Sequence, residues 1–432
     1  MNLLFLTPQL PYPPHSGTAL RNWGIIRELA RRHEITLLTF AGPGTTSSPE
    51  ARHPLSVTRH APPIPNSSAT ELAEPPERLL QEIVFAPNPA RSGPERLLQQ
   101  FLRRPDLAYR LRSSRFDAVL RRLLEGRTFD VIQIEGLEMA GALKAVRATA
   151  TKALVVYDAH NVEYVLQRSA FLADVGHPRR WAAALYSLLQ WPRLKRYEAR
   201  VCRYAGLVSC VSDQDAHALG KIAPAVRPLV IPNGLWIAEY SDVRSEKPES
   251  PSVQGLASED RSLVFTGKMD YRPNLDAVEW FIWDILPRIH ARDPVVRFTV
   301  VGQNPPPSLA SQSKDDRVLL VGAVPDTRPY IAGASVCVMP LRMGGGTRFK
   351  LLEAMALGVP VVSTRKGAEG FPVAHERELL IADSAEDFAR AVLRLLGDWD
   401  LRRVLSLAGR RFVEARYDWS AIVPRLEAAY GV

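Results

Sequence analysis

The sequence predicts an α/β protein built from two doubly wound, Rossmann-like domains that face a central cleft. A chain of 432 residues is too long for one ordinary domain and fits two. Short apolar runs alternate with helical patterns along the chain, and this alternation implies parallel βαβ units. A polar stretch rich in Pro, Ser and Glu, residues 241–261, divides the alternation into two series and is the predicted linker.

The first predicted domain, residues 1–240, contains six apolar runs typical of buried strands. Trp23, Ile26 and Leu29 recur at helical spacing after the first run, so we expect a helix there. Residues 42–95 are rich in Pro, Ser and Ala and are predicted to form an irregular insertion. The predicted strands are residues 2–7, 34–40, 130–136, 153–161, 206–212 and 227–234.

The second predicted domain, residues 262–415, repeats the pattern with six more apolar runs. Residues 416–432 are predicted to form a C-terminal helix that packs back on the first domain. Two such domains place a ligand cleft at the carboxyl ends of their strands. The predicted strands are residues 262–267, 297–302, 317–322, 334–340, 360–364 and 379–383, and the predicted helices are residues 274–290, 384–397, 400–415 and 420–431.

Composition narrows the kind of partner and the compartment. The net charge of +9 favours acidic partners such as nucleotide diphosphates or anionic lipid. We expect no nucleic acid, because the sequence has no recognised binding motif and no aromatic stacking platform. Three widely spaced cysteines are typical of small core residues in a reducing compartment. Without a charged leader or an apolar run of roughly 18–20 residues, the chain is predicted to be cytoplasmic.

The most informative motif is a glycine run that follows a predicted strand and opens a helix near Thr347. Glycines let backbone N–H groups approach an anion, and a helix N-terminus favours negative charge. Two cations beside it suit a diphosphate, and Glu353, on the face of Lys350, can accept both hydroxyls of a ribose. The alternative, a plain loop before a solvated helix, does not account for this combination. The predicted nucleotide-binding residues of the motif are Gly345, Gly346, Thr347, Arg348, Lys350 and Glu353.

This motif resembles the donor-binding signature of the GT-B-fold glycosyltransferases, particularly the large retaining group called family 4, or group 1. In that family two glutamates are separated by seven residues. The second matches Glu353, whereas the first falls on Gly345, which leaves the role of the first glutamate at the donor sugar unassigned. Variants with a Gly-Gly-Thr-Arg-x-Lys helix start resemble sugar transferases of exopolysaccharide systems, and this indicates a subfamily difference.

The resemblance extends over nearly the whole chain. Lys268 follows a strand-ending glycine and Arg272 lies four residues later, as do two cations of the family that face the donor diphosphate. The alternative is a loop with two solvated charges. Val324 lies where the family holds the base through backbone groups. Gly17 matches the first glycine loop, where the backbone approaches the phosphates or the sugar.

A polar cluster follows one strand of the first domain. Asp158, His160 and Glu163 are the predicted catalytic residues, with His160 supplying hydrogen bonds or a proton relay. This motif recurs in the resembling family. The alternative is a capped turn before a helix, with Asn161 as the cap. Glu135, past the end of another strand, is a weaker candidate.

The resemblance implies transfer of a sugar, with retention, from a nucleotide-diphosphate sugar to a glycan or lipid-linked acceptor in cell-surface polysaccharide or glycolipid biosynthesis. The departing phosphate would assist front-face attack by the acceptor hydroxyl, while the protein positions the reactants and stabilises charge. We expect no metal and no other cofactor, because no carboxylate pair typical of a metal site is suitably placed. Two alternatives stay open: a nucleotide-sugar 2-epimerase on the same fold, and a non-catalytic scaffold, which Gly345 motivates.

One basic, aromatic stretch is typical of a membrane-surface helix. Residues 179–203 hold seven Lys/Arg against one acidic residue, a composition that suits anionic lipid at the inner face of a membrane. Pro192 is expected to divide the helix, and packing against the core explains the pattern equally well. Arginine-rich helices predicted between residues 95 and 127 add to such a face. The interleaved aromatic residues are Trp181, Tyr186, Trp191 and Tyr197.

Overall fold

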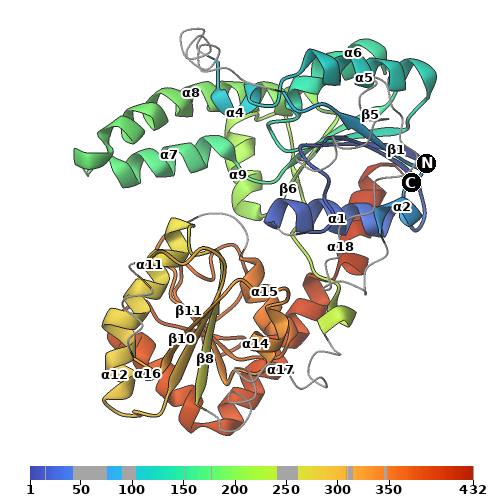
Figure 1. Cartoon of the computed structure of the whole chain (residues 1–432). Helices are drawn as coiled ribbons and strands as arrows, with labels where there is room; N and C mark the ends of the chain where they lie inside the picture. The colour runs from blue at the N-terminus through green and yellow to red at the C-terminus, as the bar shows by residue number, and fades with distance from the viewer. Residues whose placement is uncertain are drawn as a thin grey trace. The chain divides into compact units, whose positions relative to one another are not determined.

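The described residues of the computed structural model form two compact units (Figure 1). The first runs to Asn233 and resumes at Ile422, and the second takes Gly234–Ala421. The boundary therefore lies before the predicted one at residue 240. The predicted linker, residues 241–261, lies outside the description except for Arg261. The structure describes residues 1–14, 16–41, 75–89, 104–150, 152–176, 178–240, 261–307, 309, 315–344 and 348–431.

The described residues of the first unit form a seven-stranded, wholly parallel sheet in the order β3-β2-β1-β4-β5-β6-β7. The predicted doubly wound fold is thereby confirmed. One strand was missed: Glu82–Ala86 lies inside the predicted irregular insertion, yet it pairs with Thr36–Phe40 as the edge strand. The strands are β1 (Asn2–Thr7), β2 (Glu34–Phe40), β3 (Glu82–Ala86), β4 (Val131–Glu135), β5 (Leu154–Ala159), β6 (Leu207–Cys210) and β7 (Leu229–Val230).

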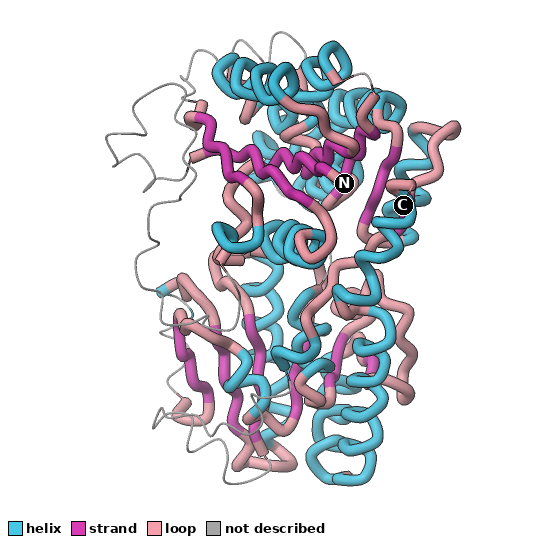
Figure 2. The backbone as a smooth tube through the Cα atoms, turned by 90° about the vertical axis from the view of Figure 1, so that its right-hand side faces the viewer, coloured by secondary structure: helices cyan, strands magenta, loops and turns pink. Residues whose placement is uncertain are grey.

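Helices lie along both faces of this sheet (Figure 2). The first begins where the Ser16 hydroxyl accepts a hydrogen bond from the Ala19 amide at 3.2 Å, as an N-cap does. Trp23, Ile26 and Leu29 are buried against the sheet as the spacing predicted. The helices of this unit are α1 (Gly17–Leu29), α2 (Pro76–Leu79), α4 (Asp106–Tyr109), α5 (Ser114–Gly126), α6 (Leu143–Thr149), α7 (Glu163–Asp174), α8 (Trp181–Tyr204) and α9 (Asp213–Ile222).

The second unit repeats the architecture with a six-stranded parallel sheet in the order β10-β9-β8-β11-β12-β13. All six of its predicted apolar runs form strands. They are β8 (Ser262–Thr266), β9 (Arg297–Val301), β10 (Val318–Gly322), β11 (Val336–Met339), β12 (Val361–Ser363) and β13 (Leu380–Ile381).

One helix of the second unit begins earlier than predicted because of a proline in its first turn. The helix predicted from residue 274 begins at Arg272, because Pro273 suits its first turn. It continues as a π-helical turn, Phe281–Ile285, before α12. The helices are α11 (Arg272–Trp280), α12 (Leu286–His290), α14 (Arg328–Ala332), α15 (Phe349–Ala356), α16 (Ala385–Gly397) and α17 (Trp399–Arg416).

The last helix, α18 (Trp419–Ala429), leads back into the first unit. Glu427 accepts hydrogen bonds from Arg32 at 2.8 and 2.9 Å and pairs with His33 at 2.7 Å. Tyr430 donates to Gln133 on β4. These contacts tie the end of the chain to the sheet of the first unit.

Helix α8 and the three cysteines were also the subject of predictions, and the structure contradicts the first and confirms the second. Pro192 does not divide its helix: α8 runs through it to Tyr204, because the proline removes only one backbone donor, at a solvent-exposed position. Cys202, Cys210 and Cys337 are all buried, as predicted for core residues. Among the described residues, no helix combines the length and the apolar character that crossing a membrane requires.

Candidate active site

The predicted cations of the second unit gather where its strand order reverses, between β8 and β11. Lys268 follows β8, and Arg348 and Lys350 follow the adjacent β11. In doubly wound sheets this reversal opens a crevice at the carboxyl ends of the strands, where ligands bind. The sheet topology therefore brings two motifs far apart in sequence to one edge.

Asn274 joins these two motifs. Its Nδ2 donates to the Lys268 carbonyl at 2.8 Å, and its Oδ1 accepts from the Lys350 ammonium at 2.8 Å. The Lys350 Nζ also lies 4.1 Å from the centre of the Phe265 ring. Gly267 makes room for this contact: at φ 151° it has a conformation that favours glycine, and a Cβ there would lie 2.7 Å from Lys350 Nζ. The ammonium is thus held in place beside the loop.

Glu353 lies one helical turn beyond Lys350 on α15. Its Oε1 accepts a hydrogen bond from the Tyr240 hydroxyl at 3.3 Å, and the Arg328 guanidinium lies 5.7 Å from the centre of the Tyr240 ring. Burial raises the pKa of Glu353 to about 7 and lowers the pKa of Lys350 to about 7. The two opposite charges therefore both titrate near neutral pH.

The other predicted donor residues differ in exposure. Lys268 and Arg272 are exposed, Val324 is half-buried in the loop after β10, and Arg348 is buried. The helix predicted to open near Thr347 begins at Phe349, after Arg348 as its N-cap residue. Outside the described residues lie Gly345, Gly346 and Thr347.

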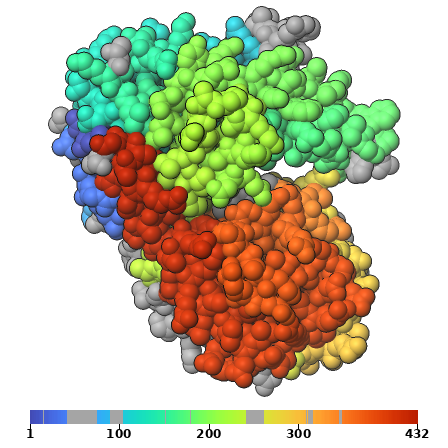
Figure 3. All heavy atoms as spheres, turned by 180° about the vertical axis from the view of Figure 1, so that it is seen from behind, coloured from blue at the N-terminus to red at the C-terminus, as the bar shows by residue number. Residues whose placement is uncertain are grey.

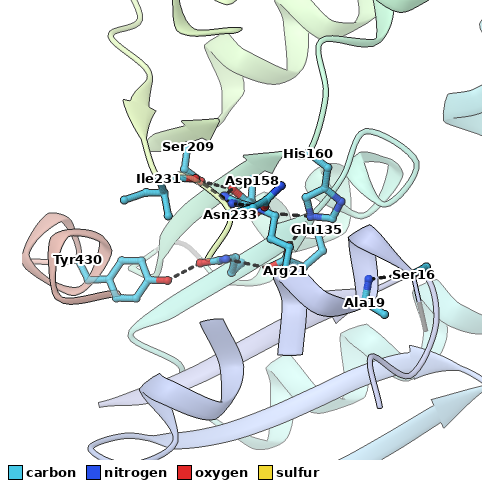
Figure 4. A network of polar contacts seen from close by, with 11 residues as sticks. Ser16, Ala19, Arg21, Glu135, Asp158, His160, Ser209, Ile231, Asn233 and Tyr430 are labelled. Atoms are coloured by element: carbon cyan, nitrogen blue, oxygen red, sulfur yellow. Dashed lines mark hydrogen bonds and ion pairs between the residues drawn. The ribbon is translucent and has the colours of Figure 1, made fainter. Parts of the chain in front are cut away.

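In the first unit, the predicted catalytic residue Asp158 forms a buried ion pair with Arg21 (Figure 4). Arg21 on α1 binds it with two parallel hydrogen bonds of 2.7 Å, from Nε and Nη2. Ser209 donates to the same carboxylate at 2.6 Å, and Arg21 Nη1 donates to Asn233 Oδ1 at 3.0 Å. Although burial opposes ionisation, Arg21 holds the pKa of Asp158 well below its usual range. The Asp158 carboxylate is thus fully buried, and its oxygens are occupied by Arg21 and Ser209.

His160 lies at the rim of this network, with its side chain 11% exposed. Its Nε2 lies 2.7 Å from Glu135 Oε2 and 3.4 Å from Asp158 Oδ2. Burial disfavours the imidazolium, but these two carboxylates outweigh it and raise the pKa of His160 to about 9. Since Nε2 is engaged by the carboxylates, the protonated ring presents Nδ1–H beside Gly136. His160 is therefore a cationic hydrogen-bond donor at neutral pH.

The two remaining predicted residues of the first unit lie at helix starts. Glu163 is the first residue of α7, and its backbone N–H donates to Glu198 at 3.1 Å. Burial raises the pKa of the Glu163 carboxyl. Gly17 is the exposed first residue of α1, directly after the Ser16 cap. The structure thus brings Asp158 and His160 together, with Glu163 three residues along the chain at the head of α7.

One group among the described residues has the composition of a metal site. Ligand atoms of Glu135, Asp158 and His160 lie within 4.8 Å of one another. Arg21, however, already binds both Asp158 oxygens, and a metal cation would be repelled by this buried guanidinium. The arginine thus already neutralises part of the negative charge of this cluster.

Comparison with known proteins places the chain in a family. Residues 16–234 match the family model described as a glycosyl transferase 4-like domain, and residues 260–398 match that of glycosyl transferases group 1. The first match alone spans more than half of the chain. The chain belongs to the group 1 glycosyltransferases.

Relatives of this group 1 chain include two named mannosyltransferases. A phosphatidyl-myo-inositol mannosyltransferase of Propionibacterium freudenreichii is 27% identical over 247 residues, which cover 55% of this chain and 58% of the relative. A GDP-mannose-dependent α-(1-6)-phosphatidylinositol monomannoside mannosyltransferase of Mycobacterium tuberculosis is 35% identical over 121 residues, 26% of this chain and 31% of that protein. The matched stretches thus span less than two thirds of either relative.

Solved structures support the fold. The structure of Anabaena Alr3699/HepE in complex with UDP and glucose superposes with a TM-score of 0.66 at 15% identity, covering 100% of this chain and 99% of that one. At this identity the likeness concerns the fold, which is GT-B.

Several residues of these clusters in the group 1 chain were not predicted, among them Arg21, Tyr240 and Asn274. A sequence signal exists only for Arg21, an arginine on the helix face that also carries buried Ile25. Tyr240 contacts Glu353 across 113 positions, and Asn274 contacts Lys350 across 76. Local patterns carry no information about such distant pairs.

Proposed function

We propose that this group 1 chain transfers a sugar from a nucleotide-diphosphate sugar, with retention of configuration, to a glycan or lipid-linked acceptor of the cell surface. The observation that carries the proposal is the cluster of Lys268, Asn274, Lys350 and Glu353 at the strand reversal of the second unit. Its pairing of cations with a nearby carboxylate matches the needs of a diphosphate and a ribose. The Mycobacterium relative is named as GDP-mannose-dependent, and the Anabaena structure holds UDP and glucose.

In this proposal each residue of the cluster has a separate role. Lys350 and Lys268 balance the charge of the diphosphate, which grows as the nucleotide leaves. The free oxygen of Glu353 accepts the ribose hydroxyls, while Tyr240 orients its partner oxygen. Arg272, exposed at the start of α11, contributes a further cation. These cations do the electrostatic work that a metal performs in other transferases, so no metal is required.

His160 acts at the sugar in the same proposal. Its Nδ1–H donates to the transferring sugar or to the acceptor, and its positive charge stabilises the developing negative charge of the leaving group. The departing phosphate accepts the proton of the attacking acceptor hydroxyl, and the new bond forms on the face from which the phosphate leaves. Relatives named for phosphatidylinositol acceptors favour a lipid-linked acceptor, and hence work as a peripheral protein at the inner face of a membrane.

A transfer assay tests this function directly. The purified chain is incubated with radiolabelled UDP-, GDP- or ADP-sugars, with and without a bacterial lipid extract, and the products are separated. We expect label in the lipid fraction only when both donor and extract are present. Conversion of the donor without any extract would identify a nucleotide-sugar 2-epimerase instead. Donor binding without any turnover would support the scaffold that Gly345 in place of the family glutamate motivates.

The assignment of Glu353 predicts a specific loss of affinity. Replacing it by alanine removes charge-assisted hydrogen bonds worth roughly 1.5–3 kcal/mol, so we expect donor binding to weaken by about one to two orders of magnitude. Isothermal titration with the nucleotide-sugar measures the change. Glu386→Ala, an exposed position on α16, is the control and should leave affinity unchanged. Equal affinities in the two folded variants would contradict the ribose assignment.

The pKa values predict a bell-shaped pH dependence of donor affinity. Bound diphosphate favours the ammonium form of Lys350, whose pKa burial lowers to about 7, so affinity should fall as pH rises above 7. Ribose hydroxyls favour the ionised form of Glu353, whose pKa burial raises to about 7, so affinity should also fall below 7. Each limb approaches about tenfold per pH unit. Titration of Glu353→Gln should lose the acid limb alone, and a flat profile for the native chain would refute both assignments.

A further inference from the structure

Helices α7 and α8 form a hairpin that runs out from the sheet of the first unit (Figures 1 and 3). They lie side by side and are joined midway by a hydrogen bond of 2.8 Å from Gln167 Nε2 to Ser187 Oγ. At the far end, Trp181 Nε1 donates to the Val175 carbonyl at 3.3 Å. This contact joins the residue after α7 to the first residue of α8.

In the outer half of this hairpin, α8 buries small or polar residues and exposes large apolar ones. On α8 the buried positions that face inward are Ala184, Ser187 and Gln190, which are small or polar, whereas a surface helix normally buries its large apolar residues. Of the sixteen large hydrophobic residues exposed among the described residues, seven lie between positions 172 and 189. We call these seven the hairpin tip: Leu172, Val175, Trp181, Leu185, Tyr186, Leu188 and Leu189.

Three large apolar side chains of the hairpin tip are more than half exposed. Trp181, Leu185 and Leu172 are 62%, 58% and 53% exposed. Trp181, Leu185, Leu188 and Leu189 follow the helical spacing that places them along one stripe. A contiguous apolar patch of this kind marks an interaction site.

The positive charge of the hairpin indicates which kind of partner binds its apolar tip. Residues 164–197 contain six Lys/Arg and one acidic residue, and that residue, Asp174, is paired with Arg180 at 3.5 Å. Lys195 and Arg196 are exposed on α8, and Arg168 lies 5.6 Å from the centre of the Trp191 ring. An apolar face with Trp and Tyr, flanked by cations, matches the interface of an anionic bilayer. A second copy of the chain would bring another positive hairpin and be repelled.

We propose that the hairpin tip inserts into the headgroup region of an anionic lipid bilayer and docks the first unit there. Leu185, Leu189 and Trp181 enter the acyl boundary, while Lys195 and Arg196 contact lipid phosphates. The docking requires no nucleotide and no sugar transfer, so it stands or falls independently of the donor chemistry.

Vesicle sedimentation tests the docking with the full chain. We expect the protein to sediment with vesicles of phosphatidylcholine and phosphatidylglycerol, weakly with phosphatidylcholine alone, and less as salt is raised. Leu185→Gln/Leu189→Gln should weaken binding about tenfold or more. Lys195→Gln/Arg196→Gln should weaken it about fivefold for each charge removed. The matched control, Val404→Gln/Leu407→Gln, changes residues that are 54% and 49% exposed on α17 of the second unit and should bind as the native chain does.

Three results would overturn the docking. One is a native chain that does not sediment with anionic vesicles. Another is an equal loss in the hairpin and control variants. The third is a native dimer by light scattering that Leu185→Gln/Leu189→Gln converts to a monomer, because a second copy would then cover the tip. Circular dichroism and donor binding of each variant show that the fold and the donor site are intact, which separates failure of docking from failure of the transferase proposal.

Discussion

Replacing Arg21 by methionine is expected to lower the free energy of unfolding of the first unit by about 3–5 kcal/mol. Arg21 is 1% exposed and makes four hydrogen bonds, two of them to Asp158. Methionine fills much of the space but leaves the Asp158 carboxylate buried without its cation. Urea denaturation followed by circular dichroism measures the loss, analysed with separate transitions for the two units.

Two further variants show whether the ion pair is the cause. Arg31→Met, just after α1, removes an arginine whose side chain is 51% exposed and paired with Glu28, so its cost should stay below about 1 kcal/mol. Arg21→Met/Asp158→Asn removes both charges and should recover part of the loss. If Arg21→Met were no more costly than Arg31→Met, the buried network would not stabilise the first unit as we describe.

His160→Ala is expected to lower kcat for sugar transfer by about 10²–10³, the usual cost of removing one preorganised donor at a developing charge. Affinity for the nucleotide-sugar should change little, because the nucleotide is assigned to the second unit. Single-turnover measurements with saturating donor separate the two quantities. His217→Ala, at an exposed position on α9, is the matched control. A His160→Ala enzyme with native kcat would remove His160 from the mechanism.

The pH profile of kcat adds a test of protonation. Glu135 and Asp158 raise the pKa of His160 to about 9, so the active imidazolium persists at neutral pH and activity should fall as pH rises through about 9. Glu135→Gln removes one of the two carboxylates and should move this alkaline limb to lower pH. An unmoved limb would mean that another group titrates there.

Most of the fold could be predicted from the sequence because both parallel sheets are buried. Their strands therefore appear as apolar runs, and all but one of the thirteen in the described residues were found. The exception, Glu82–Ala86, is an edge strand that follows a Pro- and Ser-rich stretch. The prediction that Pro192 divides its helix was wrong for a different reason. Proline is a strong local signal for a helix end, but α8 packs against α7 and continues past Pro192.

The candidate site could be predicted where a motif is local. Lys350 and Glu353 share one helical face, so spacing alone placed them together. The partner of Asp158, Arg21, lies 137 residues away, and only the folded sheet brings them within hydrogen-bonding distance. Asp158 was accordingly predicted as catalytic, whereas the structure gives it a buried ion pair and leaves His160 at the rim. Pairings of this kind arise from topology, which residue spacing does not encode.

We expect the second unit to bind a nucleotide-diphosphate sugar, and a thermal-shift screen measures this binding. The purified chain is melted with UDP, GDP, ADP and their common sugar conjugates. A ligand at 100 times its dissociation constant adds about 2.7 kcal/mol of stability, so we predict that one nucleoside diphosphate and its sugars raise the melting temperature selectively. A sample that melts cooperatively but responds to none of these ligands would show that the second unit does not bind such a donor.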